Sequence, residues 1–128
     1  CMHAEAVAVA NGDPTMIGYL SGGNFGRGFP RYVREFNAAY LALPALPSKR
    51  LKNAASDPAI VVRVIETKEH GAWLAVVNTA LTPKQAVTIT LPKGGAVTDA
   101  PTGKPLATEN GRLTLDFSPC SLRAIRIE

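Results

Sequence analysis

The chain has 128 residues, of which 46% are hydrophobic and 19% charged, and these proportions are those of one globular domain rather than a disordered segment. The formal net charge is +4, but the fourteen basic residues are scattered along the chain. Nucleic-acid binding requires a continuous basic face interleaved with stacking aromatic residues, so we expect no nucleic-acid partner. No apolar stretch approaches the roughly 20 residues that cross a bilayer, so we also expect no transmembrane segment.

The first 29 residues show no sustained periodicity. Residues 4–10 are apolar but short, carry Glu5 and lack a basic leader, so we expect no signal peptide within the chain. The run Asn11-Gly12-Asp13-Pro14 indicates a turn, and four glycines fall between residues 21 and 30. We therefore expect residues 1–29 to form an irregular N-terminal segment, the end of a preceding module or its connection.

The pattern changes to a helical one after Pro30. From Arg31 to about residue 43, apolar residues recur at three- and four-residue spacing, which predicts one amphipathic helix over 31–43. Pro30 suits the start of such a helix, and Pro44 ends it. Residues 44–58 contain three prolines and resemble a linker, so residues 30–58 are expected to form a helix followed by a proline-rich connection.

Residues 59–128 are typical of short β-strands separated by turns. Val87, Ile89 and Leu91 alternate with Thr88 and Thr90, a pattern that indicates a sheet with one face in a core and one face in water. Asn110-Gly111 predicts a tight hairpin turn. We expect strands at 60–65, 73–77, 86–91, 97–98, 112–117 and 121–127. Because turns recur every eight to twelve residues or so, the fold class is mainly β, a small antiparallel β-sandwich with one N-terminal helix.

No catalytic constellation is evident. The glycines from Gly23 to Gly28 lack the Gly-Lys-Ser/Thr ending of a phosphate-binding loop and are followed by Pro30. His3 and His70 are the only histidines and have no ligand spacing, so we expect no metal and no cofactor. A glycosidic acid pair would need two converging carboxylates, and nothing selects a pair among Asp13, Glu35, Glu66, Glu69, Asp99, Glu109 and Asp116.

The two cysteines permit at most one intramolecular disulfide, between Cys1 and Cys120. Cys1 lies at a terminus, where fraying is common, so Cys120 is expected to be a small buried hydrophobic residue rather than half of a bridge. A chain that begins with Cys1 is consistent with the remnant of a longer polypeptide or with a lipid-modified terminus.

Aromatic residues are the candidate binding groups. Trp73 shares a strand face with Ala75 and Val77, so core packing is the first expectation, and a weak sugar-stacking platform, together with Tyr19, is the second. An aromatic stripe on the predicted helix indicates a core or an interface, and aromatic residues near the glycine-rich segment would form an apolar patch if exposed. The residues expected at such an interface are Phe25, Phe29, Tyr32, Phe36 and Tyr40.

Several segments resemble the C-terminal β-sandwich that follows a (β/α)8 catalytic barrel in bacterial glycoside hydrolases. The segment 71–79 is similar to their strand ending in asparagine, here Asn78, and 97–106 is similar to their Thr-Asp hairpin with a Thr-Gly-Lys turn. Residues 113–125 are similar to their last two strands, although Cys120 stands where an aromatic residue is usual. The stretch 31–47 resembles their linker helix, so the resemblance covers about residues 30–128.

This resemblance implies a non-catalytic accessory domain that docks on and stabilises the catalytic barrel of the same polypeptide. The catalytic acids of such enzymes lie on the barrel, so no catalytic residue is implied here. The alternative is a carbohydrate-binding module that uses an exposed aromatic platform to bind an oligosaccharide or polysaccharide. The resemblance also implies a role in carbohydrate metabolism and favours a periplasmic or extracellular location.

Overall fold

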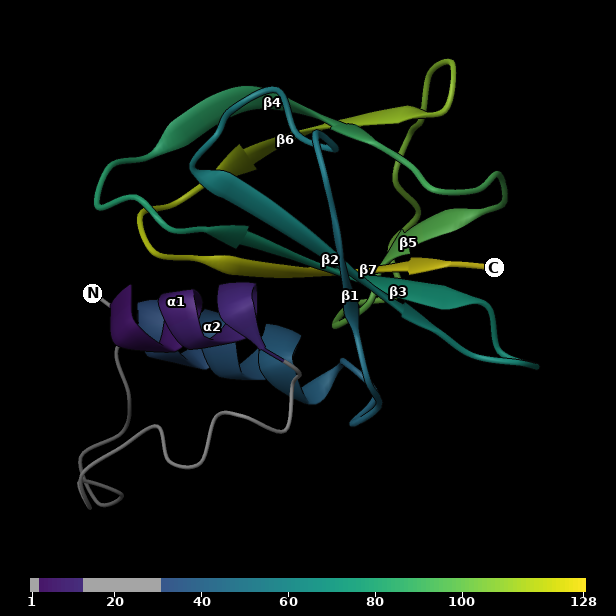
Figure 1. Ribbon diagram of the computed structural model, residues 1–128, viewed down its shortest axis with the longest axis horizontal. Coiled ribbons are helices and arrows are strands. Elements are labelled where there is room, and N and C mark those ends of the chain that lie inside the picture. The colour runs from purple at the N-terminus through teal and green to yellow at the C-terminus, as the bar shows by residue number, and fades with distance from the viewer. Residues whose placement is uncertain (1–2, 13–30) are drawn as a thin grey trace.

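The computed structural model describes residues 3–12 and 31–128, and in this part the chain is mainly β (Figure 1). Two helices, α1 (His3–Asn11) and α2 (Arg31–Leu41), precede the strands in the sequence. The strands are β1 (Lys49–Leu51), β2 (Ile60–Glu66), β3 (Ala72–Asn78), β4 (Lys84–Thr90), β5 (Val97–Asp99), β6 (Arg112–Phe117) and β7 (Leu122–Ile127). None of the helices in the described residues is long and apolar enough to cross a membrane.

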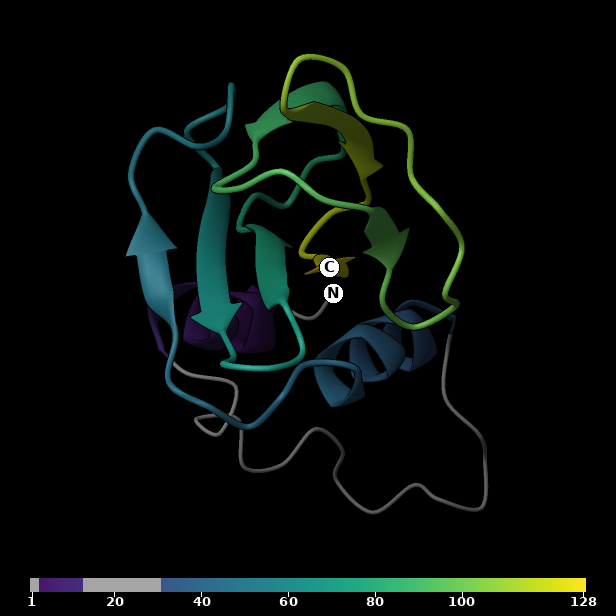
Figure 2. The ribbon, with the colours of Figure 1, turned by 90° about the vertical axis from the view of Figure 1, so that its right-hand side faces the viewer.

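The strands form two antiparallel sheets. The larger has the order β1-β2-β3-β7-β5, and the smaller pairs β4 with β6. Figures 1 and 2 show the pair β4–β6 on one side of the larger sheet and the two helices on the other. The predicted antiparallel β-sandwich is therefore confirmed, with a helical layer added to it.

Each side of the larger sheet has its own hydrophobic core. Alternate residues of β3, such as Leu74 and Val76, pack between the sheets with Ile89 of β4 and Leu113 of β6. The intervening residues, such as Val77, pack under the helices. The expectation of one face in water therefore holds for β4 and β6, the strands whose alternation predicted it. In contrast, β2, β3 and β7 are largely buried on both faces, because α1 and α2 cover their outer face.

The expected irregular segment 1–29 is corrected in part, because His3–Asn11 is a helix. Ala6, Val9 and Ala10 of α1 are buried against the larger sheet. Arg63 of β2 holds the end of this helix: its Nη1 donates to the carbonyl oxygen of Ala10 at 3.5 Å, and its Nε donates to Ser48 Oγ at 2.7 Å. A cation at the helix C-terminus also opposes the negative end of the helix dipole.

The proline-rich stretch 44–58 is also more ordered than a linker. Lys49–Leu51 pairs with β2 as the edge strand β1, and Ala55 forms a bridge with Ile89 of β4. The Asn110-Gly111 turn is confirmed, since both residues have positive φ, 51° and 72°.

Asp57 connects this stretch to both sheets. One carboxylate oxygen accepts the N–H of Ala59 at 2.8 Å, and the other lies 3.2 Å from Lys84 Nζ. The Ala59 N–H, followed by the Lys84 ammonium, lowers the pKa of Asp57 below its ordinary value of 3.8.

A depressed carboxyl pKa predicts a stability contribution that is present above pH 3.8 and is lost as pH falls through the folded-state pKa. Asp57→Asn should therefore make the free energy of unfolding less dependent on pH below 3.8, and Lys84→Gln should remove only the smaller part of this dependence. Urea unfolding at a series of pH values measures both. Identical pH dependence in the wild type and in Asp57→Asn would contradict the assignment.

Candidate docking face and cleft

The aromatic stripe of α2 is divided between the core and the surface. Phe36 is 2% exposed and lies in the core between α2 and the larger sheet, whereas Tyr32 is 50% exposed and Tyr40 is half-buried. The prediction that Phe36 belongs to an interdomain surface is therefore wrong, because the domain itself buries that ring. Tyr19, Phe25 and Phe29 lie outside the described residues.

Large apolar side chains are nevertheless exposed on the helical layer. Leu41 at the end of α2 is 79% exposed, and Val7 of α1 is 36% exposed. Together with Tyr32 they form what we call the helix-layer residues. Sequence periodicity did not single out Val7 or Leu41, because exposure depends on how each helix is rotated on the sheet.

Trp73 is half-buried and packs against the core beneath the helices, in agreement with the core packing expected from its strand face. The register of β3 and β7 places Arg126 opposite Trp73, and the guanidinium carbon lies 5.2 Å from the ring centroid. Arg126 Nη2 also donates to the carbonyl oxygen of His70 at 3.5 Å. A sugar that stacked on this ring face would have to displace a cation–π contact.

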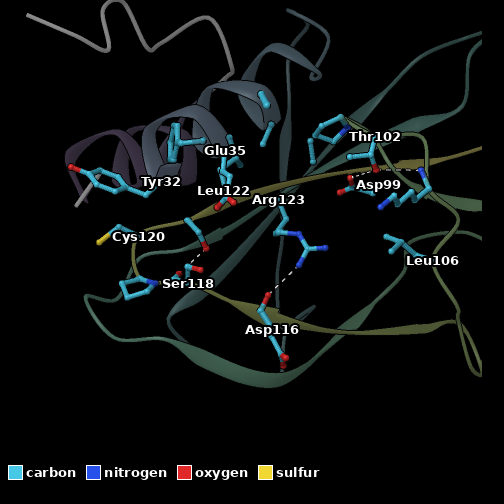
Figure 3. A pocket seen from close by; sticks show the side chains of 18 residues that line it. Tyr32, Glu35, Asp99, Thr102, Leu106, Asp116, Ser118, Cys120, Leu122 and Arg123 are labelled. Atoms are coloured by element: carbon cyan, nitrogen blue, oxygen red, sulfur yellow. Dashed lines mark hydrogen bonds between the residues drawn. The ribbon is translucent and has the colours of Figure 1, made fainter. Parts of the chain in front are cut away.

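A cleft of about 540 Å³ opens between α2, the β6–β7 corner and the turn after β5 (Figure 3). Tyr32, Glu35 and Ala39 contribute the α2 wall, and Leu122 and Ala124 of β7 lie at its base. The remaining sides come mainly from Asp99, Thr102, Asp116, Ser118 and Arg123. These residues come from segments far apart in the sequence.

Four of the charged side chains of the cleft, those of Glu35, Asp99, Asp116 and Arg123, contact other groups of the domain. Arg123 Nη1 donates to the carbonyl oxygen of Asp116 at 3.1 Å, and Asp116 Oδ1 accepts the N–H of Ala86 at 2.8 Å. Thr102 Oγ1 donates to Asp99 Oδ2 at 2.6 Å, and Glu35 pairs with Arg31 at 2.6 Å. The cleft is thus suited to binding through polar and apolar contacts. Within residues 3–12 and 31–128, no group of three or more His, Cys, Asp or Glu side chains could hold a metal ion.

Cys120 is buried at one end of this cleft, 2% exposed, as predicted. Its Sγ lies 3.5 Å from the carbonyl oxygen of Ala80. The expectation of a reduced side chain is wrong, because Cys120 is disulfide-bonded. The only other cysteine of the sequence, Cys1, lies outside the described residues.

Comparison with known proteins gives a likeness of fold. No family model and no curated protein sequence matches the chain. Among solved structures, AmyP in complex with maltose matches 77% of this chain with a TM-score of 0.54 and 22% identity, and a substituted AmyP in complex with maltotriose matches 68% with 0.52 and 18%. A protein assigned as an alpha-galactosidase/melibiase from Bacteroides fragilis matches 66% with 0.50 and 14%.

These matches cover a small part of each of the larger proteins. The aligned region spans 20% and 17% of the two AmyP chains and 18% of the Bacteroides fragilis chain. At these identities the likeness concerns the fold alone. About two thirds to three quarters of this chain therefore shares its architecture with a small part of each of these proteins.

Proposed function

We propose that this chain is a non-catalytic accessory β-sandwich of a bacterial carbohydrate-active hydrolase, which docks on and stabilises the catalytic domain of the same polypeptide. The observation that carries this proposal is the match of its fold to about a fifth of each of three chains, among them an alpha-galactosidase/melibiase and a protein solved with maltose. Most of each protein lies outside the shared fold, where we place the catalytic domain.

Two features of the chain support this proposal. The helix-layer residues Val7, Tyr32 and Leu41 are apolar and exposed, which suits contact with a neighbouring domain. The disulfide at Cys120 suits an oxidising compartment, which agrees with a periplasmic or extracellular enzyme.

The mass of the native polypeptide tests the proposal. An antibody raised against this chain should detect, in the organism from which the sequence comes, a species several-fold heavier than 13.5 kDa. Sequencing that species by mass spectrometry should identify a catalytic domain. A native species near 13.5 kDa would overturn the accessory role and favour a free-standing carbohydrate-binding module.

Leu41→Asp tests the docking surface. Because Leu41 is 79% exposed, only the unfavourable position of a carboxylate at the C-terminus of α2 should matter, and the free energy of unfolding of the separate 128-residue chain should change by no more than about 1 kcal/mol. In the full polypeptide the charge would enter the domain interface, so limited proteolysis between the domains should become faster and their thermal transitions should separate.

Leu81→Asp is the matched control for this experiment. Leu81 is 66% exposed and lies between β3 and β4, outside the helical layer. If both variants left the full polypeptide equally resistant to proteolysis, docking through the helical layer would be rejected, whatever the native mass.

A further inference from the structure

The edge of β7 is only partly covered by its neighbour. On one side β7 pairs with β3 along its whole length, from Leu122 to Ile127. On the other side β5 pairs only with Ile125, Arg126 and Ile127. The last backbone hydrogen bond on the β5 side joins the N–H of Ala100 to the carbonyl oxygen of Ala124 at 2.9 Å. The chain then turns away from β7 through Gly103. Among the described residues, the first residues of β7 therefore have no neighbouring strand on this side and form a short free edge.

The backbone groups of Leu122 point from this edge into the cleft. In an antiparallel sheet, consecutive residues direct their N–H and C=O groups to opposite neighbouring strands. The carbonyl of Ser121 accepts from Asn78 on the β3 side, and the carbonyl of Ala124 accepts from Ala100 on the β5 side. Leu122 lies two residues before Ala124 on β7, so its N–H and C=O point to the same side as those of Ala124, toward the position that β5 would occupy if it were longer.

These backbone groups lie in a recess rather than on an open surface. Leu122 as a whole is 4% exposed, and it lies at the base of the 540 Å³ cleft. None of the inter-segment backbone bonds among the described residues uses its N–H or C=O. Recessed backbone groups without a partner are uncommon in folded proteins, and a strand added along such an edge supplies the missing donor and acceptor.

We propose that the cleft binds an extended peptide segment. The peptide would add to the larger sheet as a strand beside Leu122, continuing the position of β5 along the edge of β7. This inference is independent of the proposed accessory role. Figure 3 shows α2 on one side of the β7 edge and Asp116 of β6 on the other, so that the cleft would enclose both faces of an added strand. Edge addition of this kind derives affinity from main-chain hydrogen bonds and selectivity from alternate side chains.

The cleft walls define the chemistry of the peptide. Its α2 side is a closed apolar wall that includes Phe36 and Ala39, only 2% and 3% exposed, and such a wall suits small apolar side chains. Asp116 is exposed on the opposite side. The other two carboxylates already have partners, since Glu35 pairs with Arg31 and Asp99 accepts from Thr102, and the cations of the lining are Lys104 and Arg123. The Arg123 guanidinium already donates to the carbonyl oxygen of Asp116. The exposed Asp116 carboxylate is the group that a basic side chain of the peptide would meet, so a peptide that alternates apolar and basic residues suits this cleft.

The probe is the synthetic peptide acetyl-Lys-Val-Lys-Val-Lys-amide, and the readout is amide hydrogen exchange by NMR on the disulfide-intact chain. In the free protein the Leu122 amide should exchange faster than the Arg123 amide, which faces β3. At saturating peptide the Leu122 amide should become at least about tenfold slower to exchange. Titration of the amide shifts should give a Kd of about 1 mM or below.

Two N-methylated peptides provide the control. Methylation of both valine nitrogens, or of the lysine nitrogens, removes donors from opposite edges of the added strand, so one peptide should lose binding and the other should retain it. A peptide with glutamate in place of lysine should bind more weakly. The proposal would be overturned by a Leu122 amide that is already as protected as Arg123 in the free protein. Equal binding of the two methylated peptides, or the absence of binding at about 1 mM, would also overturn it.

Discussion

Replacing Phe36 with aspartate is expected to unfold most of the domain at neutral pH. The ring is 2% exposed and joins α2 to the larger sheet in the core that also holds Ile65 and Leu122. Truncating such a ring costs about 3–5 kcal/mol, and a buried unpaired carboxylate adds to that loss. Because a domain of this size is stable by about 5–15 kcal/mol, we expect a large fall in the urea midpoint or no cooperative transition.

Two further variants separate the packing of Phe36 from general effects on α2. Ala38→Asp places the same charge on the exposed side of the helix and should change the free energy of unfolding by no more than about 1 kcal/mol. Phe36→Leu keeps an apolar side chain and should cost about 1–2 kcal/mol. If Phe36→Asp and Ala38→Asp unfolded at the same urea concentration, the position of α2 on the sheet would be wrong.

Much of the β-sandwich could be predicted from the sequence because the signals were local. In β6, buried Leu113, Leu115 and Phe117 alternate with exposed Thr114 and Asp116, and this period-two pattern needs no knowledge of the partner strand. The spacing of Val33 and Phe36 likewise predicted α2.

The helix α1 was missed because its sequence carries no periodic signal. Its residues alternate alanine with valine, so apolar residues occur on every side of the helix. Alanine favours the helical conformation, but nine residues are too few for a stable helix in isolation. The contacts of Ala6 and Val9 with the larger sheet stabilise it, and such tertiary contacts cannot be inferred from local sequence.

The candidate site was the least predictable part. Phe36 was expected at a surface because a helical apolar stripe indicates either a core or an interface, and only the sheet decides between them. The cleft joins Tyr32, Asp99, Asp116 and Leu122, which no sequence motif connects. Its free edge depends on where β5 stops pairing with β7, and strand register is a property of the folded sheet.

Replacing Asn78 with aspartate or leucine is the second change for which we expect a large effect. Asn78 ends β3 and is 0% exposed, and its Nδ2 donates to the carbonyl oxygens of Thr82 and Ser118, each at 3.0 Å. Its Oδ1 accepts the N–H of Ala80 at 3.0 Å. One amide thus fixes the turn before β4 to the end of β6. Leucine would leave three backbone groups without a partner, so we expect a loss of about 3 kcal/mol or more.

The aspartate variant adds a pH signature that distinguishes lost hydrogen bonds from lost packing. An ionised carboxylate could still accept from Ala80, but it would face two carbonyl oxygens without a donor, which raises its pKa in the folded state. A raised carboxyl pKa makes the penalty small below the unfolded-state pKa of about 3.9 and larger as pH rises through the folded-state value. Relative to the wild type, Asn78→Asp should therefore lose more stability at pH 7 than at pH 4, whereas Asn78→Leu should lose similar amounts at both. The exposed Asn110→Asp, in the turn before β6, serves as the control, and an Asn78→Asp penalty that is independent of pH would mean that Asn78 does not donate to these carbonyls.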